Sequence, residues 1–114
     1  MNEHDIFNEI VKLHMPKEID GWDIHVRMLD DDYKQYNGRK ILEMKAICRE
    51  FPRVHTIRIV IPYDFSLPDY IGKFEREEDK IWVYEEYVKY ITETLYSMLH
   101  KIMDAIISGG ELDE

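Results

Sequence analysis

The stretch that decides the fold is "KILEMKAICREFPRVHTIRIVI" (residues 40–61), in which apolar and polar residues alternate on both sides of Pro52. Such alternation predicts two β-strands, each with one face turned toward a hydrophobic core. Pro52 indicates a turn between them, so the strands form a hairpin. The inward-facing residues are expected to be Leu42, Met44, Ala46 and Cys48 on the first strand and Ile57, Ile59 and Ile61 on the second.

The register of this hairpin follows from where its turn is placed. A tight turn centred on Pro52 and Arg53 pairs Cys48 with Ile57. The same turn pairs Met44 with residue 61, so both apolar sets lie on one face of the sheet.

Toward the N-terminus, "GWDIHVRML" (residues 21–29) alternates as well and predicts a third strand. Asn37-Gly38 is a strong two-residue hairpin signal. A hairpin turn there, however, pairs Met28 with Ile47 and turns the two apolar sets to opposite faces. The segment "LDDDYKQY" (residues 29–36) is therefore expected to form a bulge or a wider loop.

Helical periodicity flanks the strands. Residues 3–14 carry one apolar stripe, and Pro16 ends the helix. The connection at residues 62–74 is expected to contain one helical turn capped by Ser66. A long helix follows from an acidic start at 75–79 to Gly109. Its predicted stripe comprises Ile81, Tyr84, Val88, Ile91, Leu95, Met98, Ile102 and Ala105.

This order predicts one α+β domain over residues 1–114: an N-terminal helix, a three-stranded antiparallel meander and a long C-terminal helix, with both helices packed on one sheet face. A chain of 114 residues is long enough to bury a core. Cys48 is the single cysteine, which favours a reducing, cytoplasmic location. No apolar run is long enough to span a membrane, so membrane association is not expected.

The charge of the chain is unevenly distributed. The formal net charge is −9, yet residues 22–61 carry eight basic and six acidic side chains, a net charge of +2, which leaves −11 for the remainder. The basic residues fall on the sheet face turned away from the core. They either form cross-strand ion pairs on a solvated face, or they recognise an acidic segment of a protein partner. The predicted partner-binding residues are Arg27, Lys45, Ile47, Arg49 and Arg58.

No pattern for catalysis, metal binding or a cofactor is found. The five histidines show no metal-ligand spacing. The run Asp30–Asp32 lacks the alternating spacing of a calcium loop, and the glycines form no phosphate-binding pattern. No catalytic residue, metal or cofactor is therefore predicted, and the chain is expected to be non-enzymatic.

The sequence thus favours a non-enzymatic protein-interaction module that acts as a homodimer and contacts a protein partner. The C-terminal helix has more apolar width than one sheet face needs, and its predicted dimer interface comprises Tyr96, Leu99, Met103 and Ile106. The alternative is an acidic inhibitor that mimics nucleic acid and blocks a basic DNA-binding target. Direct binding of nucleic acid is not expected, because the −11 remainder repels phosphate.

The run "VHTIRIVIPYDFSLPDY" (residues 54–70) resembles the end of the strand meander in RWD and ubiquitin-conjugating-enzyme-like domains. The resemblance covers the element order of residues 3–70, and the motif spacing departs from that of the family. It implies an α+β fold without conjugating activity, because Cys48 lies on a predicted strand and not where a ubiquitin-carrying cysteine would lie.

Overall fold

A computed structural model describes residues 3–62 and 75–109. The expected helical turn near Ser66 lies outside these residues. The α+β fold is confirmed, but the antiparallel sheet has four strands and not three. The elements are α1 (Glu3–His14), β1 (Glu18–Ile19), β2 (Trp22–Leu29), β3 (Ile41–Cys48), β4 (Val54–Val60) and α3 (Glu77–Ser108).

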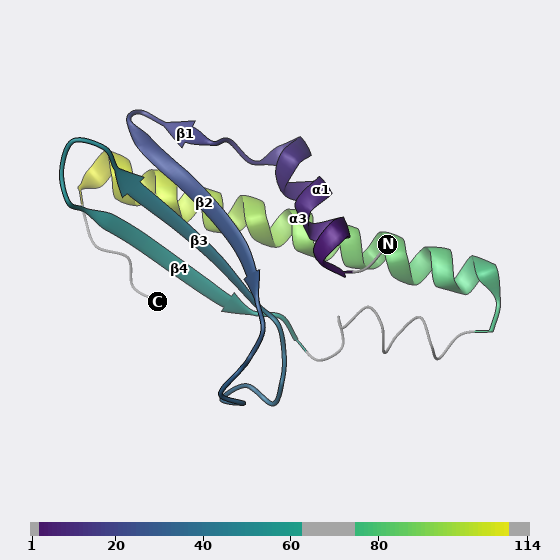
Figure 1. Cartoon of the computed structure of the whole chain (residues 1–114). Coiled ribbons are helices and arrows are strands. Elements are labelled where there is room, and N and C mark those ends of the chain that lie inside the picture. Colours follow the sequence, from purple (N-terminus) through teal and green to yellow (C-terminus); the bar gives the residue numbers. More distant parts are fainter. Residues whose placement is uncertain (1–2, 63–74, 110–114) are drawn as a thin grey trace.

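The strands follow the order β1-β2-β3-β4, and every neighbouring pair is antiparallel. Helix α3 packs on one face of the sheet, which we call the inner face, and α1 lies beside β2 and packs on α3 (Figure 1). The opposite side, which no helix of the described residues covers, is the open face. The core lies between the inner face and α3; its most deeply buried side chains include Leu42, Met44, Ile91, Leu95, Met98 and Ile102.

The additional strand β1 arises from a tight hairpin that the alternation of residues 21–29 does not reveal. Ile19 pairs with Trp22 across Asp20 and Gly21. Both turn residues have positive φ, 49° and 85°, as a type I′ turn requires. Asp-Gly is a strong signal for this turn, so the strand could have been predicted from these two residues.

The register predicted for the hairpin of β3 and β4 is wrong by four residues. Met44 pairs with Ile57 and not with Ile61. The Cys48 N–H donates to the Arg53 carbonyl at 3.0 Å, so the turn precedes the predicted centre. The face assignment survives because an even shift returns every side chain to the same side. Cys48 itself is only partly buried, since it is the last residue of β3.

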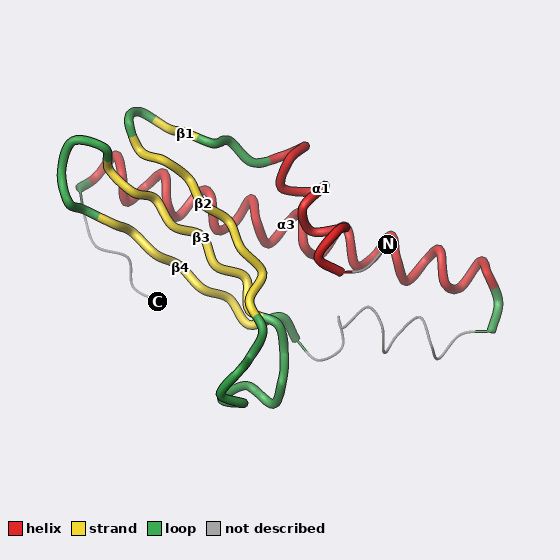
Figure 2. Tube along the Cα trace, viewed as in Figure 1, coloured by secondary structure: helices red, strands yellow, loops and turns green. Residues whose placement is uncertain are grey.

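The loop at residues 30–40 is wide, as predicted, and brings Met28 opposite Leu42. A single carboxylate organises it: Asp31 accepts hydrogen bonds from the backbone N–H groups of Gln35 (3.0 Å), Tyr36 (2.7 Å) and Gly38 (3.0 Å). Asn37 and Gly38 do form a turn with positive φ, but within this loop and not between paired strands. Figure 2 shows the loop projecting beyond the ends of β2 and β3.

Helix α3 ends at Gly109, which adopts φ 68° and donates its N–H to the Ala105 carbonyl, as predicted. The predicted stripe packs against the core from Val88 onward and is wrong for its first two residues. Val83 and Tyr87 are buried, whereas Ile81 and Tyr84 are exposed. Two rotations of the first turns fit the apolar pattern, because helical positions recur every 3.6 residues, and the sequence alone does not choose between them.

Candidate functional site: a charged cluster on the open face

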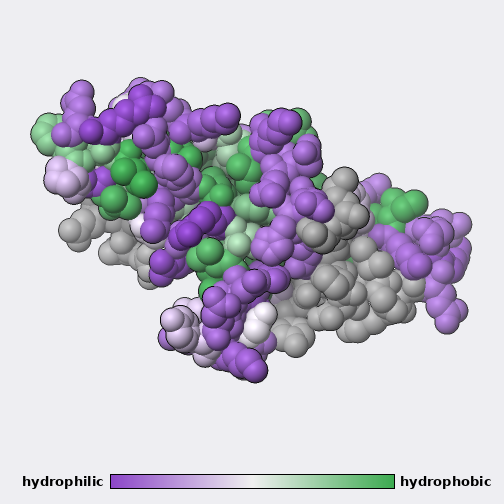
Figure 3. Space-filling model, in the orientation of Figure 1, coloured by the Kyte–Doolittle hydropathy of each residue, from purple (hydrophilic) through white to green (hydrophobic). Residues whose placement is uncertain are grey.

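The open face carries four rows of side chains that run across β2, β3 and β4. The strand registers align the residues of each row. Figure 3, viewed toward this face, shows hydrophilic residues with hydrophobic ones between them. From the end at the wide loop, the rows are Leu29–Ile41–Val60, Arg27–Glu43–Arg58, His25–Lys45–Thr56 and Asp23–Ile47–Val54.

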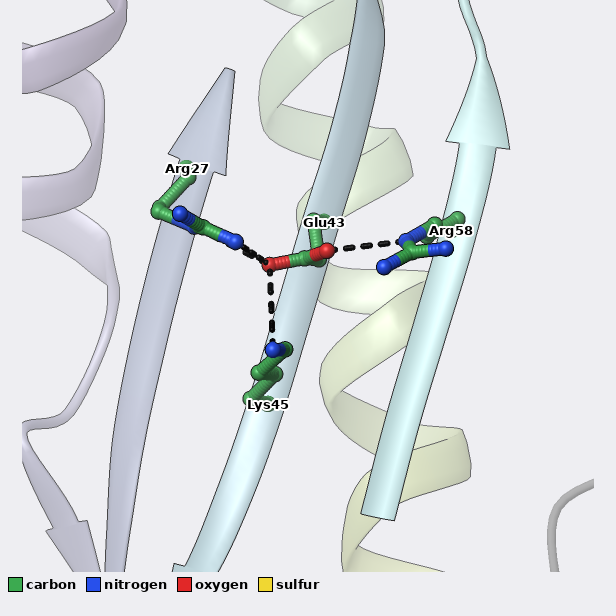
Figure 4. A network of polar contacts seen from close by, with 4 residues as sticks. All are labelled: Arg27, Glu43, Lys45 and Arg58. Atoms are coloured by element: carbon green, nitrogen blue, oxygen red, sulfur yellow. Dashed lines mark hydrogen bonds and ion pairs between the residues drawn. The ribbon is translucent and has the colours of Figure 1, made fainter. Parts of the chain in front are cut away.

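The second row contains the most buried charge on the open face. The Glu43 residue is only 1% exposed. Arg27 donates from Nε to its Oε1 at 3.0 Å, and Arg58 donates from Nε to Oε2 at 2.8 Å. The Lys45 Nζ lies 4.0 Å from Oε1 (Figure 4). We call these four residues, Arg27, Glu43, Lys45 and Arg58, the Glu43 cluster.

The electrostatics of the Glu43 cluster favour its charged form. Burial alone raises the pKa of the Glu43 carboxyl, but hydrogen bonds from Arg27 and Arg58 outweigh burial, and the pKa is lowered. The cluster carries three positive charges and one negative charge. About half of each arginine side chain stays exposed, 55% and 53%. The formal charges of these four residues sum to +2, and one fixed carboxylate holds the three cations in place.

Arg49 does not belong to this cluster. It donates from Nε to Asp23 Oδ1 at 3.0 Å, and its Nη2 lies 3.2 Å from Glu18. These hydrogen bonds lower the pKa of Asp23 and raise that of Arg49. This second group has one base and two acids, so it adds no positive charge to the open face.

Next to the Glu43 cluster, the wide loop and the sheet enclose a hollow of about 690 Å³. The apolar row Leu29–Ile41–Val60 and Arg58 form its floor, and Tyr33 and Tyr36 belong to its loop side. Ile47, the apolar residue predicted to contact a partner, lies at the other end of the face and is 37% exposed. Apolar surface therefore flanks the cations on both sides.

The sequence predicts that Arg27, Lys45 and Arg58 lie on one face but does not identify Glu43 as their common partner. In the register that it predicted, Glu43 lies opposite residue 62 and Arg58 lies opposite Ile47. The correct register sets Glu43 between Arg27 and Arg58. The position of Glu43 on the central strand was the available signal, since a charge there is shielded by neighbours on both sides.

The predicted dimer residues occupy different environments on α3. Leu99 is 8% exposed and belongs to the core. Met103 and Ile106 are partly buried and pack against it. Tyr96 is 40% exposed, and its hydroxyl lies 3.1 Å from Nδ1 of His14 on α1. The outward surface of this stripe is therefore Tyr96 with parts of Met103 and Ile106.

The acidic loop has a structural role in the described part of the chain. The loss of hydration raises the pKa of Asp31, but three backbone N–H groups outweigh it and lower that pKa. Asp30 forms an ion pair with Lys40. Within residues 3–62 and 75–109, no three His, Cys, Asp or Glu side chains gather as metal ligands would. In the same ranges, no helix is both long enough and apolar enough to cross a bilayer.

Comparisons with known proteins found no match: no family model, no curated protein and no solved structure is similar to this chain.

Proposed function

We propose that this chain is a non-enzymatic protein-interaction module whose open sheet face binds an acidic segment of a partner protein in a reducing compartment such as the cytoplasm. The single observation that supports the proposal is the Glu43 cluster. It concentrates a charge of +2 on one face of a chain whose net charge is −9.

The arrangement suits recognition because the cations are already oriented. Glu43 already holds the guanidinium groups of Arg27 and Arg58 by hydrogen bonds. These side chains therefore lose less conformational entropy on binding a carboxylate than mobile arginines would. The acidic remainder of the chain repels a short acidic segment less than it repels nucleic acid, because physiological salt screens charges beyond about 8 Å and a short segment contacts only the cluster, whereas nucleic acid carries charge along its whole length. Direct contact with the cluster therefore dominates.

Selection from a displayed library of random peptides tests the proposal. Peptides selected on the folded chain are expected to be rich in Asp and Glu. Lys45→Glu should weaken their binding at least about tenfold. Lys101→Glu, on the exposed side of α3, changes the net charge equally and serves as the matched control. Melting temperatures verify that both variants fold.

Peptides without acidic enrichment, or equal binding by the Lys45→Glu and Lys101→Glu variants, would refute this function. Lys45→Gln provides a milder second variant, since it removes the charge without placing a carboxylate beside Glu43. Its effect on binding should fall between those of the wild type and Lys45→Glu.

We further propose that the module is a homodimer formed through the outward surface of Tyr96, Met103 and Ile106. Amphipathic aromatic and Met side chains of this kind are enriched at interfaces. Sedimentation equilibrium should then give twice the monomer mass, and Met103→Glu should reduce it to that of the monomer. A wild-type monomer at micromolar concentration would remove the dimer but not the binding face.

A second candidate function, an acidic mimic of nucleic acid, is favoured by one observation. The N-terminal half of α3 extends past the sheet (Figure 1). It carries the exposed acids Glu77, Glu78, Glu85 and Glu86. A mimic would bind basic DNA-binding domains with an affinity that rises steeply as salt falls. Absence of binding to a panel of such domains at low salt would dismiss this candidate.

A further inference from the structure

The outer edge of β4 is the longest sheet edge that the described residues leave unpaired. Strand β4 is the last in the order β1-β2-β3-β4. In Figures 1 and 2 no described element runs alongside it. At the other end of the sheet, β1 pairs with the first residues of β2. An edge strand of this length offers backbone donors and acceptors to another strand.

The ladder between β3 and β4 determines which backbone groups face outward. The Ile61 N–H donates to the Lys40 carbonyl at 2.8 Å, and the Cys48 N–H donates to the Arg53 carbonyl at 3.0 Å. Both bonds follow the register of the paired strands. Since bonding alternates along an antiparallel strand, the odd-numbered residues of β4 bond to β3. The even-numbered ones direct their backbone groups to the outer edge: Val54, Thr56, Arg58 and Val60.

We propose that this edge of β4 accepts the acidic partner segment as an added antiparallel strand. The inference rests on the proposed function and specifies how the partner binds. In an antiparallel pair, residues that exchange hydrogen bonds place their side chains on the same face. The partner residues bonded to Thr56 and Arg58 therefore carry their side chains on the open face, beside the Glu43 cluster.

The chemistry of the added strand follows from its two faces. On the open face, directly opposite side chains lie about 5 Å apart, so a partner carboxylate reaches Arg58. On the inner face, the added side chains lie beside Ile57, which is 4% exposed, and the partly buried Ile59. Apolar residues suit that side. The expected partner segment alternates acidic and apolar residues.

A second copy of this chain is a poorer occupant of the same edge. Strand β4, "VHTIRIV", contains no acidic residue. Pairing two β4 strands would place two Glu43 clusters, each with a charge of +2, on one continuous face without adding a counter-charge. An acidic partner segment supplies that charge, so charge complementarity selects it over self-pairing.

Binding of a labelled peptide that alternates valine and glutamate, measured by fluorescence anisotropy, tests the proposal. The expected result is binding that a valine–lysine peptide does not show. N-methylation of the glutamates removes the N–H groups aimed at β4 and should weaken binding at least about tenfold. N-methylation of the valines, whose N–H groups point away, should leave it unchanged.

The outcomes separate this inference from the proposed function. If the peptide binds and neither methylation matters, acidic recognition holds and strand addition is wrong. If only valine methylation weakens binding, the antiparallel arrangement is wrong. If neither the alternating peptide nor any acidic peptide from the library binds, the proposed function fails as well.

On the protein side, Thr56→Pro removes one outward N–H and leaves the ladder to β3 intact, because proline is tolerated where a strand N–H faces solvent. It should abolish peptide binding at an unchanged melting temperature. Thr56→Val, which keeps the N–H, is the matched control and should bind normally. A wild-type dimer that Thr56→Pro converts to a monomer would overturn the proposal in favour of self-pairing.

Discussion

Each face of β3 contains fully buried side chains, and the two faces bury them by different means. On the inner face, Leu42, Met44 and Ala46 are all 0% exposed beneath α3. On the open face, where neither α1 nor α3 packs, Glu43 is 1% exposed and is surrounded by charged neighbours. One face excludes water with apolar packing, and the other shields a charge with opposite charges.

This difference shows that burial alone does not describe how a residue stabilises the fold. The free energy of unfolding gained from an apolar side chain depends on area and packing and is insensitive to pH. That gained from Glu43 depends on its ionisation and on the cations around it. Variants of the two faces should therefore respond differently to truncation, pH and salt.

The largest effect is expected on the inner face. Met44→Ala removes a fully buried side chain and leaves a cavity, so it should reduce the free energy of unfolding by about 2–5 kcal/mol in urea denaturation. Ile47→Ala, on the open face of the same strand, is the control and should cost far less, since Ile47 is 37% exposed. Equal losses would mean that the two faces are packed alike.

Glu43→Gln should have the next largest effect. It removes the charge that three cations share and weakens two hydrogen bonds to charged groups, which costs about 1–3 kcal/mol. Glu50→Gln, an exposed acid beyond the end of β3, is the matched control. If both variants are as stable as the wild type by urea denaturation, the cluster does not stabilise the sheet.

The pH dependence sharpens the contrast between the faces. The pKa of Glu43 in the folded state lies below its ordinary value of 4.5, so its contribution is complete above that value and is lost as pH falls through the folded-state pKa. The stability gap between wild type and Glu43→Gln should therefore close in acid, whereas the gap for Met44→Ala should persist. The pKa values of Asp23, Asp30 and Asp31 are also lowered. They change the acid stability of the wild type, Glu43→Gln and Met44→Ala equally, so both stability gaps are unaffected by them. Urea denaturation at a series of pH values measures both gaps.

Substitution of Tyr87 should change the free energy of unfolding by a smaller amount, and it should stabilise the fold where the preceding substitutions destabilise it. Its side chain is buried on the core side, and its hydroxyl has no hydrogen-bond partner among residues 3–62 and 75–109. Burial, with a smaller contribution from the Glu3 carboxylate, raises the pKa of Tyr87. Tyr87→Phe removes an unsatisfied polar atom and should stabilise the fold by about 1 kcal/mol in thermal unfolding. Tyr84→Phe, at an exposed position, should change nothing; destabilisation by Tyr87→Phe would reveal a bonded hydroxyl.

Arg49→Gln should have the smallest effect, because the ion pairs of Arg49 with Asp23 and Glu18 are solvent-exposed. Arg58→Gln, on the same face but bonded to buried Glu43, should cost clearly more. Raising the salt concentration should reduce both losses, and the Arg49 loss should vanish first. A larger loss for Arg49→Gln than for Arg58→Gln in urea would reverse this ranking of the two ion-pair groups.

Much of the fold could be predicted from local signals. The period-two alternation assigned the faces of β2, β3 and β4, while Pro16 and Gly109 marked the helix ends. The rotation of α3 before Val88 could not be predicted, because Val83 and Tyr87 fit the helical period as well as Ile81 and Tyr84 do. Packing against the rest of the fold determines which of the two faces of the helix is buried, and the local apolar pattern does not distinguish them.

The candidate site could be predicted only in part. Arg27, Lys45 and Arg58 lie on the face assigned to them, because the face depends only on parity. Their gathering around Glu43 depends on register, and the hydrophobic pattern is identical for every even shift. The strand β1 was not predicted, because its two residues are too few to show a period-two alternation. Asp20-Gly21 nevertheless indicated its turn.

Because the hydrophobic pattern of β3 and β4 is the same for every even shift, Glu43 also influences which register the hairpin adopts during folding. A β3–β4 hairpin displaced by two or four residues still turns the apolar side chains of the inner face toward the core, so hydrophobic collapse does not reject it. Only the aligned hairpin seats the carboxylate between two guanidinium groups. We therefore expect Glu43→Leu to retain a compact sheet while admitting misaligned chains, visible as doubled backbone amide resonances; a single set would show that the turn alone enforces alignment.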